Sequence, residues 1–272
     1  MVGGIGKKAR MQFIIILAAC NGVITVQKAT ESLGIESNRV CNLLTYLEKN
    51  GWIRRVKRGV YVPVPAVGAS DEYDFLDEPW LLAHEVYHPC YIGGWTAAQH
   101  WDFTEQIYQS VCVVTSKRVN SHNKKIDNEV IRIKKCSSDQ MFGTAPFWIG
   151  KTKIAISDPT KTIIDILNDP LLAGGIRPAT DMLLSYLRSE HFDELLLLEY
   201  AAKMKNRTIL KRLGFLVEKF SPKCDKIIKN CRENLSKGYS FLDPKVKDNF
   251  LIKKWRLWVP KSFKDVKEFR DR

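Results

Sequence analysis

Polar side chains recur at helical spacing between residues 37 and 49. When that segment is turned by about 100° per residue, four of them fall on one side: Asn38, Asn42, Thr45 and Lys49. Arg39 and Tyr46 flank the same side. Asparagine can bond adenine in two places, threonine can touch the methyl group of thymine, and lysine or arginine can bind guanine or phosphate. These side chains fit a helix that reads the major groove of DNA, and the alternative is a solvated helix surface.

Apolar residues around this face predict the two helices of a helix-turn-helix. A stripe with spacing i, i+3, i+4 and i+7 lies on the opposite side of the second helix: Val40, Leu43, Leu44 and Leu47. Ala29 is small where the helices cross, Gly34 permits a tight connection, and Ile35 fills the space between the helices. We expect Ser37 to cap the second helix by accepting a hydrogen bond from its unpaired amides.

A short basic hairpin is predicted directly after the second helix. Residues 52–56 and 60–62 have the composition of strands, and Lys57, Arg58 and Gly59 form the turn. Four cations lie at the tip and edge of this wing, where they would meet backbone phosphates: Arg54, Arg55, Lys57 and Arg58. Some winged helices bind proteins instead, but such modules seldom need four cations on the wing.

The pattern as a whole predicts a winged helix-turn-helix that binds double-stranded DNA. The predicted DNA-binding residues are Ser37, Asn38, Arg39, Asn42, Thr45, Tyr46, Lys49, Arg54, Arg55, Lys57 and Arg58.

The charge of the chain is strongly basic and unevenly divided. The 272 residues carry 43 Lys and Arg against 30 Asp and Glu, a net charge of +13. Ten bases and three acids give +7 over residues 1–62, two bases and eight acids give −6 over residues 63–118, and residues 119–272 restore +12. A basic excess of this kind points first to nucleic acid. The blocks favour separate faces or domains that meet separate partners.

We predict an α+β fold in four parts. They are a winged helix-turn-helix at 1–64, a linker at 65–77, a mixed α/β domain at 78–220 and a basic helical extension at 221–272. Helices are expected near 78–87, 96–101, 180–188 and 192–204, with another opened by Ser157 and Asp158, whose core face holds Ile163, Ile164 and Leu167. Strands are expected near 110–115, 129–134 and 147–156.

Cysteine usage and the first apolar run bear on location. The seven cysteines are an odd number without a Cys-x-x-Cys pair, which suggests neither a disulfide framework nor a zinc ribbon. A reducing cytoplasm fits this pattern best. The apolar run at residues 13–19 is too short to span a bilayer, so we interpret it as the first core helix and expect no membrane partner.

Titratable residues give little support to catalysis or metal binding. His84, His88 and Cys90 have helix-compatible spacing, but a proline interrupts the helix and no further ligand lies nearby. We expect Asp158 at a helix N-cap and Asp165 on the surface or in a salt bridge. No glycine-rich phosphate loop or nucleophile elbow is present. The protein is therefore expected to be no enzyme and to need no cofactor or metal.

The C-terminal part of the chain is the most basic. From residue 203 onward, 21 bases stand against eight acids. Aromatic residues are interleaved with them: Phe215, Phe220, Tyr239, Phe241, Trp255 and Trp258. Such a segment is either a solvated lysine-rich surface, or one whose aromatics pack while its lysines reach phosphate on operator DNA or on RNA bound by a toxin.

Three segments resemble the AbiEi-type antitoxins, a family of predicted regulators of viral defence found in type IV toxin-antitoxin operons. They are residues 58–63 (RGVYVP), 91–100 (YIGGWTAAQH) and 156–165 (ISDPTKTIID). The resemblance implies a winged helix that represses its own operon by binding inverted repeats, and a C-terminal domain that counters a nucleotidyltransferase-like toxin. After Phe220 the chain departs from the family pattern.

The first hypothesis is accordingly a cytoplasmic DNA-binding repressor and antitoxin. Its partners would be operator inverted repeats and a cognate nucleotidyltransferase-like toxin. The oligomeric state stays open between monomer and dimer, and a dimer on DNA is compatible with two half-sites. The alternatives are a nucleic-acid-processing enzyme that uses the winged helix for delivery, and an adaptor whose C-terminal domain binds a protein.

Overall fold

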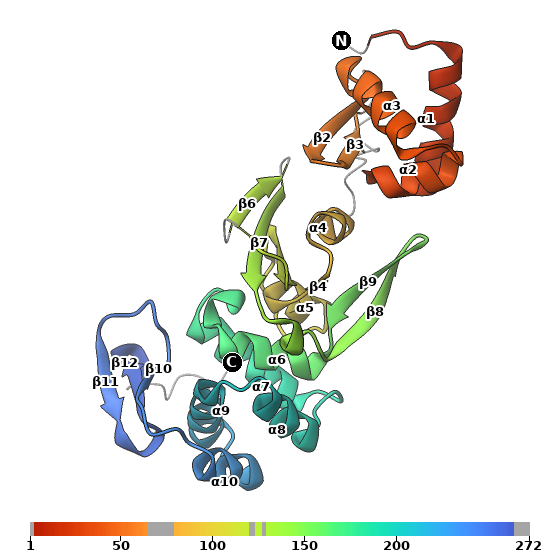
Figure 1. Ribbon diagram of the computed structural model, residues 1–272. Helices are drawn as coiled ribbons and strands as arrows, with labels where there is room; N and C mark the ends of the chain where they lie inside the picture. Colours follow the sequence, from red (N-terminus) through yellow and green to blue (C-terminus); the bar gives the residue numbers. More distant parts are fainter. Residues whose placement is uncertain (1–2, 65–78, 120–122, 127–128, 264–272) are drawn as a thin grey trace. The chain divides into compact units, whose positions relative to one another are not determined.

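The computed structural model describes residues 3–64, 79–119, 123–126 and 129–263. Two compact units divide the chain, and the ribbon passes between them several times (Figure 1). The first unit comprises Met1–Ile92, Gln109–Lys135 and Pro146–Ala155, and the second comprises Gly93–Tyr108, Cys136–Ala145 and Ile156–Arg272. The predicted linker, residues 65–77, lies outside the described residues. The predicted domain boundaries stay a prediction, and each unit is described by itself.

The first unit begins with three helices and a small sheet. The helices are α1 (Lys7–Cys20), α2 (Val26–Leu33) and α3 (Ser37–Lys49), and the strands are β1 (Ile24–Thr25), β2 (Ile53–Lys57) and β3 (Val60–Pro63). The sheet has the order β1-β3-β2 with antiparallel neighbours. Three helices followed by a hairpin are the element order expected of a winged helix.

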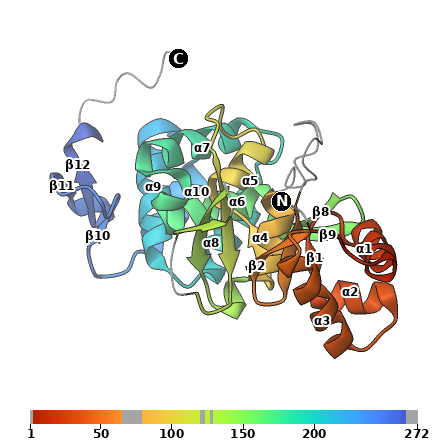
Figure 2. The same ribbon diagram turned by 90° about the horizontal axis from the view of Figure 1, so that it is seen from above.

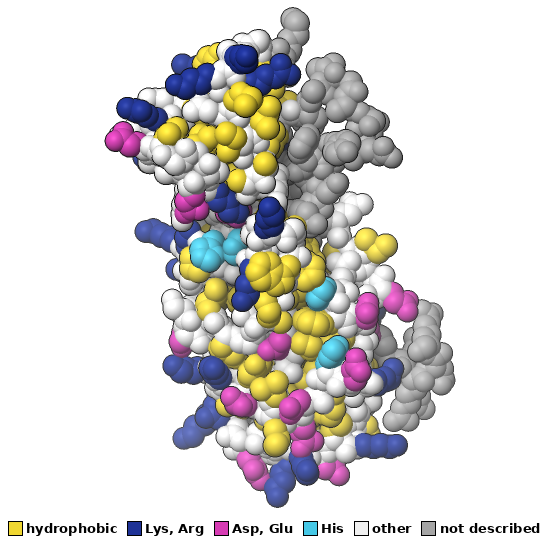
Figure 3. Space-filling view, turned by 90° about the vertical axis from the view of Figure 1, so that its right-hand side faces the viewer, with side chains coloured by type: hydrophobic (Ala, Val, Ile, Leu, Met, Phe, Trp, Pro, Cys, Tyr) yellow, Lys and Arg dark blue, Asp and Glu magenta, His cyan; other side chains and the backbone are white. Residues whose placement is uncertain are grey.

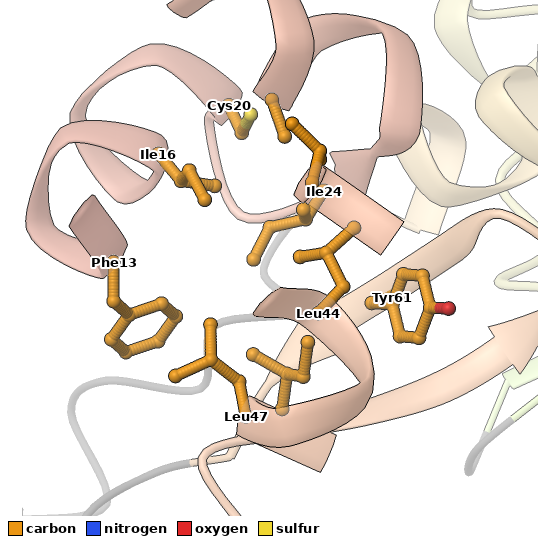
Figure 4. Packing of buried hydrophobic residues seen from close by; sticks show 10 residues of the cluster. Phe13, Ile16, Cys20, Ile24, Leu44, Leu47 and Tyr61 are labelled. Atoms are coloured by element: carbon orange, nitrogen blue, oxygen red, sulfur yellow. The ribbon is translucent and has the colours of Figure 1, made fainter. Parts of the chain in front are cut away.

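Apolar side chains from all three helices and the sheet form one core in this region. Figure 4 shows Phe13 and Ile16 of α1 facing Leu44 and Leu47 of α3, with Tyr61 of β3 beside them. Each large aliphatic side chain buried in this way stabilises the fold by about 1.5–3 kcal/mol. The predicted apolar stripe of α3 therefore has the role expected of it, as does the run at residues 13–19.

A six-stranded sheet forms the other part of the first unit and extends into the second. Its strands are β4 (Cys90–Ile92), β5 (Ser110–Thr115), β6 (Asn123–Ile126), β7 (Glu129–Lys135), β8 (Thr144–Ile149) and β9 (Thr152–Ser157), in the order β6-β7-β5-β4-β9-β8. The neighbouring strands β5 and β7 run parallel, and β4 and β5 run antiparallel. Helix α4 (Pro79–Tyr87) packs against β5, where the Thr115 hydroxyl lies 2.9 Å from the carbonyl oxygens of both Tyr87 and Pro89.

The single strand predicted at residues 147–156 is wrong. This stretch belongs to a hairpin of β8 and β9 that turns at Gly150, whose φ of 55° lies in the left-handed region. Glycine adopts that conformation at little cost, so the turn falls in the middle of what the sequence presented as one apolar run.

The second unit is mostly helical. Its helices are α5 (Gly94–His100), α6 (Pro159–Asn168), α7 (Ile176–Arg188), α8 (Glu194–Lys203), α9 (Arg207–Phe220) and α10 (Asp225–Glu233). Helix α6 packs against α5, α7, α8 and α9 and buries Ile163, Ile164 and Leu167, which confirms the predicted core face. Figures 1 and 2 show α9 and α10 side by side.

Two aspartates of α6, Asp158 at its N-cap and Asp165 within the helix, each have a role in the sequence-based prediction. Asp158 accepts a hydrogen bond from the Lys161 amide at 2.7 Å, so its N-cap role is confirmed. Asp165 is only 4% exposed and pairs with the buried ammonium of Lys161. The salt-bridge interpretation of Asp165 is confirmed and the surface interpretation is wrong, because the two residues lie one helical turn apart on the inner side of α6.

A helical extension is predicted over residues 221–272, of which 264–272 lie outside the described residues; within 221–263 the only α-helix is α10. The chain then forms β10 (Ser240–Phe241), β11 (Asn249–Ile252) and β12 (Leu257–Pro260), a sheet of order β10-β12-β11 beside α9 (Figures 1 and 2). The reason is visible in β12, where Leu257 and Val259 are buried and Trp258 is exposed. That alternation has the period of a strand.

None of the described helices is long and apolar enough to cross a membrane. All seven cysteines are free thiols.

Candidate nucleic-acid interface

Helix α3 presents its predicted reading face to solvent. Every member of the set is exposed: Ser37, Asn38, Arg39, Asn42, Thr45, Tyr46 and Lys49. Val40, Leu44 and Leu47 on the other side are fully buried. The helix is therefore held by its apolar stripe, and its polar side chains are not required for packing.

Three side chains of the exposed face, Thr45, Tyr46 and Cys41, have surroundings that bear on contact with a ligand. Thr45 donates its hydroxyl to the Cys41 carbonyl at 2.8 Å, which satisfies the hydroxyl and leaves the methyl group as its outward apolar contact. Tyr46 is 42% exposed although it is a large aromatic residue. Cys41 is exposed next to Asn42, and the sequence analysis missed it because a cysteine carries no DNA-reading signal of its own.

The predicted N-cap role of Ser37 is wrong. Glu36 occupies the N-cap position in an extended conformation, Ser37 is the first helical residue, and no side chain caps α3. The carbonyl of Glu36 already accepts the first helical hydrogen bond, from the Val40 amide at 3.1 Å. The carboxylate of Glu36 therefore lies at the positive end of the α3 dipole.

The wing pairs an exposed cationic strand, β2, with a buried strand, β3. Arg54 and Arg55 of β2 are exposed, as is Arg58 in the turn, whereas Val60 and Tyr61 of β3 are buried. Figure 3, which views the side of the molecule on which α1 lies, also shows Lys and Arg gathered over α1 and its neighbours. The turn closes at Gly59, whose φ is 80°. A cationic wing adjoining a polar helix face can bind DNA phosphates and base edges at once.

Comparison with known proteins bears on this segment. Residues 12–64 match the family model described as "Transcriptional regulator, AbiEi antitoxin". Among curated protein sequences, none matches the chain significantly. The crystal structure of the RV2827C protein from Mycobacterium tuberculosis resembles the chain with a TM-score of 0.57 and 13% identity, over 95% of this chain and 93% of that one. At that identity the similarity shows the fold alone.

The AbiEi match confirms the suspected resemblance over α1 to β3, the part that carries the reading face and the wing. The other two resembling segments lie outside the matched residues. Both are largely interior: Trp95, Ala97 and Ala98 are buried in α5, and residues 160–167 of α6 are buried throughout. The residue types of these two segments therefore serve packing. In the AbiEi-matching part, the exposed polar and cationic side chains of the predicted interface lie on α3 and β2 and in the turn after β2.

One predicted wing residue, Lys57, has a structural partner. Its ammonium donates to the Val86 carbonyl at 3.0 Å and lies 5.9 Å from the centre of the Tyr87 ring. Burial lowers the pKa of Lys57, and the nearby cations Lys117 and Lys124 lower it further. Lys57 thus anchors the wing to the end of α4. Its assignment as a DNA contact is untested, and this anchoring role is the competing assignment.

Further cations that the sequence did not assign lie near the wing in the first unit. Lys117 and Arg118 follow β5, and Lys124 and Lys125 belong to β6; all four are exposed. The same Lys117 and Lys124 are close enough to Lys57 to perturb it. The only advance signal was the return of positive charge after residue 116, which gives no position in space.

His84 and His88 lie close together near the end of α4. Their ring centres lie 5.0 Å apart, and burial lowers the pKa of His84. Within residues 3–64, 79–119, 123–126 and 129–263, no group of three His, Cys, Asp or Glu side chains is placed to hold an ion.

Proposed function

We propose that this protein is a sequence-specific DNA-binding transcriptional regulator that represses its own operon and acts, in the cytoplasm, as the antitoxin of a type IV toxin-antitoxin pair. The observation that carries the proposal is the exposed polar face of α3 beside the arginines of β2, within the residues that match the AbiEi family. The structural positions of these groups support duplex DNA as the ligand.

Base reading is assigned to the middle of α3. Asn38 and Asn42 lie four residues apart on the exposed side, about one turn, so that both can reach base edges of adjacent pairs in the major groove. Thr45 adds its methyl group toward a thymine. Each well-made base contact discriminates against the wrong base by about 1–3 kcal/mol.

Backbone binding is assigned to the helix ends and the wing. Arg55, Arg58 and Lys49 would each neutralise a phosphate, which fixes the register of α3 without reading sequence. Two copies on an inverted repeat would place one α3 in each half-site. The protein would then act as a monomer or dimer in solution and as a dimer on its operator.

The experiment that tests DNA recognition uses the full chain and the promoter region of its own operon. Asn42→Ala is expected to weaken operator binding by about tenfold, in keeping with the loss of one bidentate base contact, and to leave binding to unrelated DNA unchanged. Gln109→Ala removes an exposed amide elsewhere in the first unit and is the matched control. Equal operator affinity of Asn42→Ala and Gln109→Ala would refute the assignment of α3 as the reading helix.

The antitoxin part rests on the family match and on the resembling segments. Its test is co-expression with a nucleotidyltransferase-like gene from the same operon, where growth arrest by that gene alone should be relieved by the full chain. Asn42→Ala should relieve arrest as well as wild type does, because toxin neutralisation does not use the reading face. Persistent arrest in the presence of the folded wild-type chain would contradict the antitoxin function and leave DNA binding unaffected.

A further inference from the structure

Three aromatic side chains are exposed at the small C-terminal sheet. Tyr239, Phe241 and Trp258 are 57%, 47% and 36% exposed. Phe241 and Trp258 are direct partners on the neighbouring strands β10 and β12, and Tyr239 lies two residues before Phe241. Because directly paired residues on neighbouring strands point to the same side of a sheet, Phe241 and Trp258 share a face. Tyr239 lies directly before β10. These three exposed residues are called here the aromatic face.

Packing of the sheet does not require the aromatic face. The opposite side holds Leu242, Leu257 and Val259, all fully buried. Trp255 is also fully buried, and its ring lies directly against Gly214 of α9. The aromatics of the C-terminal part thus divide into two groups, one that packs the sheet onto α9 and one left open to solvent.

Exposed lysines occur in the chain segments that adjoin the aromatic face. Residues 235–263 contain seven bases and two acids, a net charge of +5. Lys254 pairs with Glu218, and Lys261 with Asp248. Four other cations are exposed and form no ion pair within the described chain: Lys237, Lys245, Lys247 and Lys253. Lys237 lies two residues before Tyr239, and Lys253 directly follows β11.

We propose that the aromatic face is a stacking platform for single-stranded RNA. Exposed aromatics on neighbouring strands can each stack one unpaired base, and cations beside them follow the phosphate backbone. Bases in duplex DNA are already stacked, whereas the unpaired bases of RNA strands and loops are accessible to aromatic side chains. Four exposed lysines favour a polyanion over an apolar partner, and the aromatic side chains beside them favour a polyanion that also has bases to stack. This site is separate from α3 and the wing, which lie in the first unit.

The test measures the fluorescence anisotropy of a labelled 12-nucleotide RNA of mixed sequence with the full chain. Phe241→Ala and Trp258→Ala are each expected to weaken RNA binding about fivefold or more, the lower limit for loss of one stacked base. Trp258→Phe keeps a ring for stacking and should bind RNA nearly as well as wild type. Lys253→Gln should lower the dependence of log affinity on log salt concentration by about 0.7.

The matched control is Trp148→Ala, which removes a 62% exposed tryptophan of β8 outside the aromatic face and should leave RNA binding unchanged. Circular dichroism confirms that each variant is folded. Equal RNA affinity of wild type and the Phe241→Ala/Trp258→Ala double variant would overturn the proposal. Tighter binding of single-stranded DNA of the same sequence would also overturn it. The same holds if the wild type is a dimer that Trp258→Ala dissociates, and RNA binds to neither the dimer nor the monomer. Operator binding by the double variant should match wild type, so failure of this proposal and of the DNA-binding function are distinguishable.

Discussion

The wing offers the most discriminating prediction, because its four cations differ in their surroundings. Arg55, Lys57 and Arg58 are all exposed, but only the Lys57 ammonium among these three is shown donating to a carbonyl, that of Val86 at 3.0 Å. Each phosphate contact contributes about 0.9 to the slope of log affinity against log salt concentration. Arg55→Ala/Arg58→Ala should therefore flatten the slope by about 1.8, and Lys57→Met should leave the slope unchanged.

The magnitude is large enough for a routine measurement. Salt rising from 50 to 200 mM, a factor of about four, should cost the wild type about tenfold more affinity for operator DNA than the double arginine variant. Lys57→Met should instead lower the free energy of unfolding by about 1 kcal/mol, the value of a typical intramolecular hydrogen bond. Affinity is measured by fluorescence anisotropy at several potassium chloride concentrations, and stability by urea denaturation.

Arg188→Ala, at the exposed end of α7, is the control for the loss of an arginine outside the wing and should not alter the slope. The reasoning is refuted if the double arginine variant keeps the wild-type slope, or if Lys57→Met flattens the slope as much as loss of one arginine does.

Two further predictions concern stability of the second unit. Lys161→Met should cost about 3–5 kcal/mol in urea denaturation, because it leaves the Asp165 carboxylate buried without its partner; adding Asp165→Asn should recover part of the loss, and a cost below about 1 kcal/mol would contradict the buried pair. Burial opposes ionisation of Glu218, but hydrogen bonds from Lys254 and Trp255 outweigh it and lower the pKa of this carboxyl. The stabilising effect of the Glu218 carboxylate should be present above the unfolded pKa of about 4.3 and be lost as pH falls through the lower folded pKa. The urea midpoint of Glu218→Gln should therefore fall less steeply on acidification than that of the wild type. Parallel pH profiles of the two proteins would be inconsistent with this role.

Local patterns predicted the N-terminal elements well, since their determinants are close in sequence. The stripe of α3 and the left-handed turns at Gly34 and Gly59 need only a few neighbouring residues. The Ser37 cap failed on one detail of the same kind, because the helix begins at Ser37 itself and not one residue later. The same residue types occur at the capping position and at the first helical position, so the sequence alone does not distinguish the two.

Features that depend on distant contacts were harder to predict. The choice between a surface position and a salt bridge for Asp165 stayed open because charge pattern alone carries no information on burial. Lys117 and Lys124 approach the wing only after β5, β6 and α4 have assembled. The lysine-rich C-terminal part suggested helix by composition, whereas the strand period of residues 257–259 covers too few positions to outweigh it. The DNA contacts themselves stay predictions.

The contact between Trp255 and Gly214 has an evolutionary consequence. A side chain at position 214 would occupy the space of the indole ring, since even a Cβ there would collide with it. In related chains the two positions should therefore change together, with a larger residue at 214 accompanied by a smaller one at 255. A chain cut after Phe220 would leave α9 with an open socket in place of this ring. The sequence after Phe220 departs from the pattern of the AbiEi-type family. Even so, the contact between Trp255 and Gly214 means that this segment and α9 must evolve together, so the segment could not have been exchanged freely as a module.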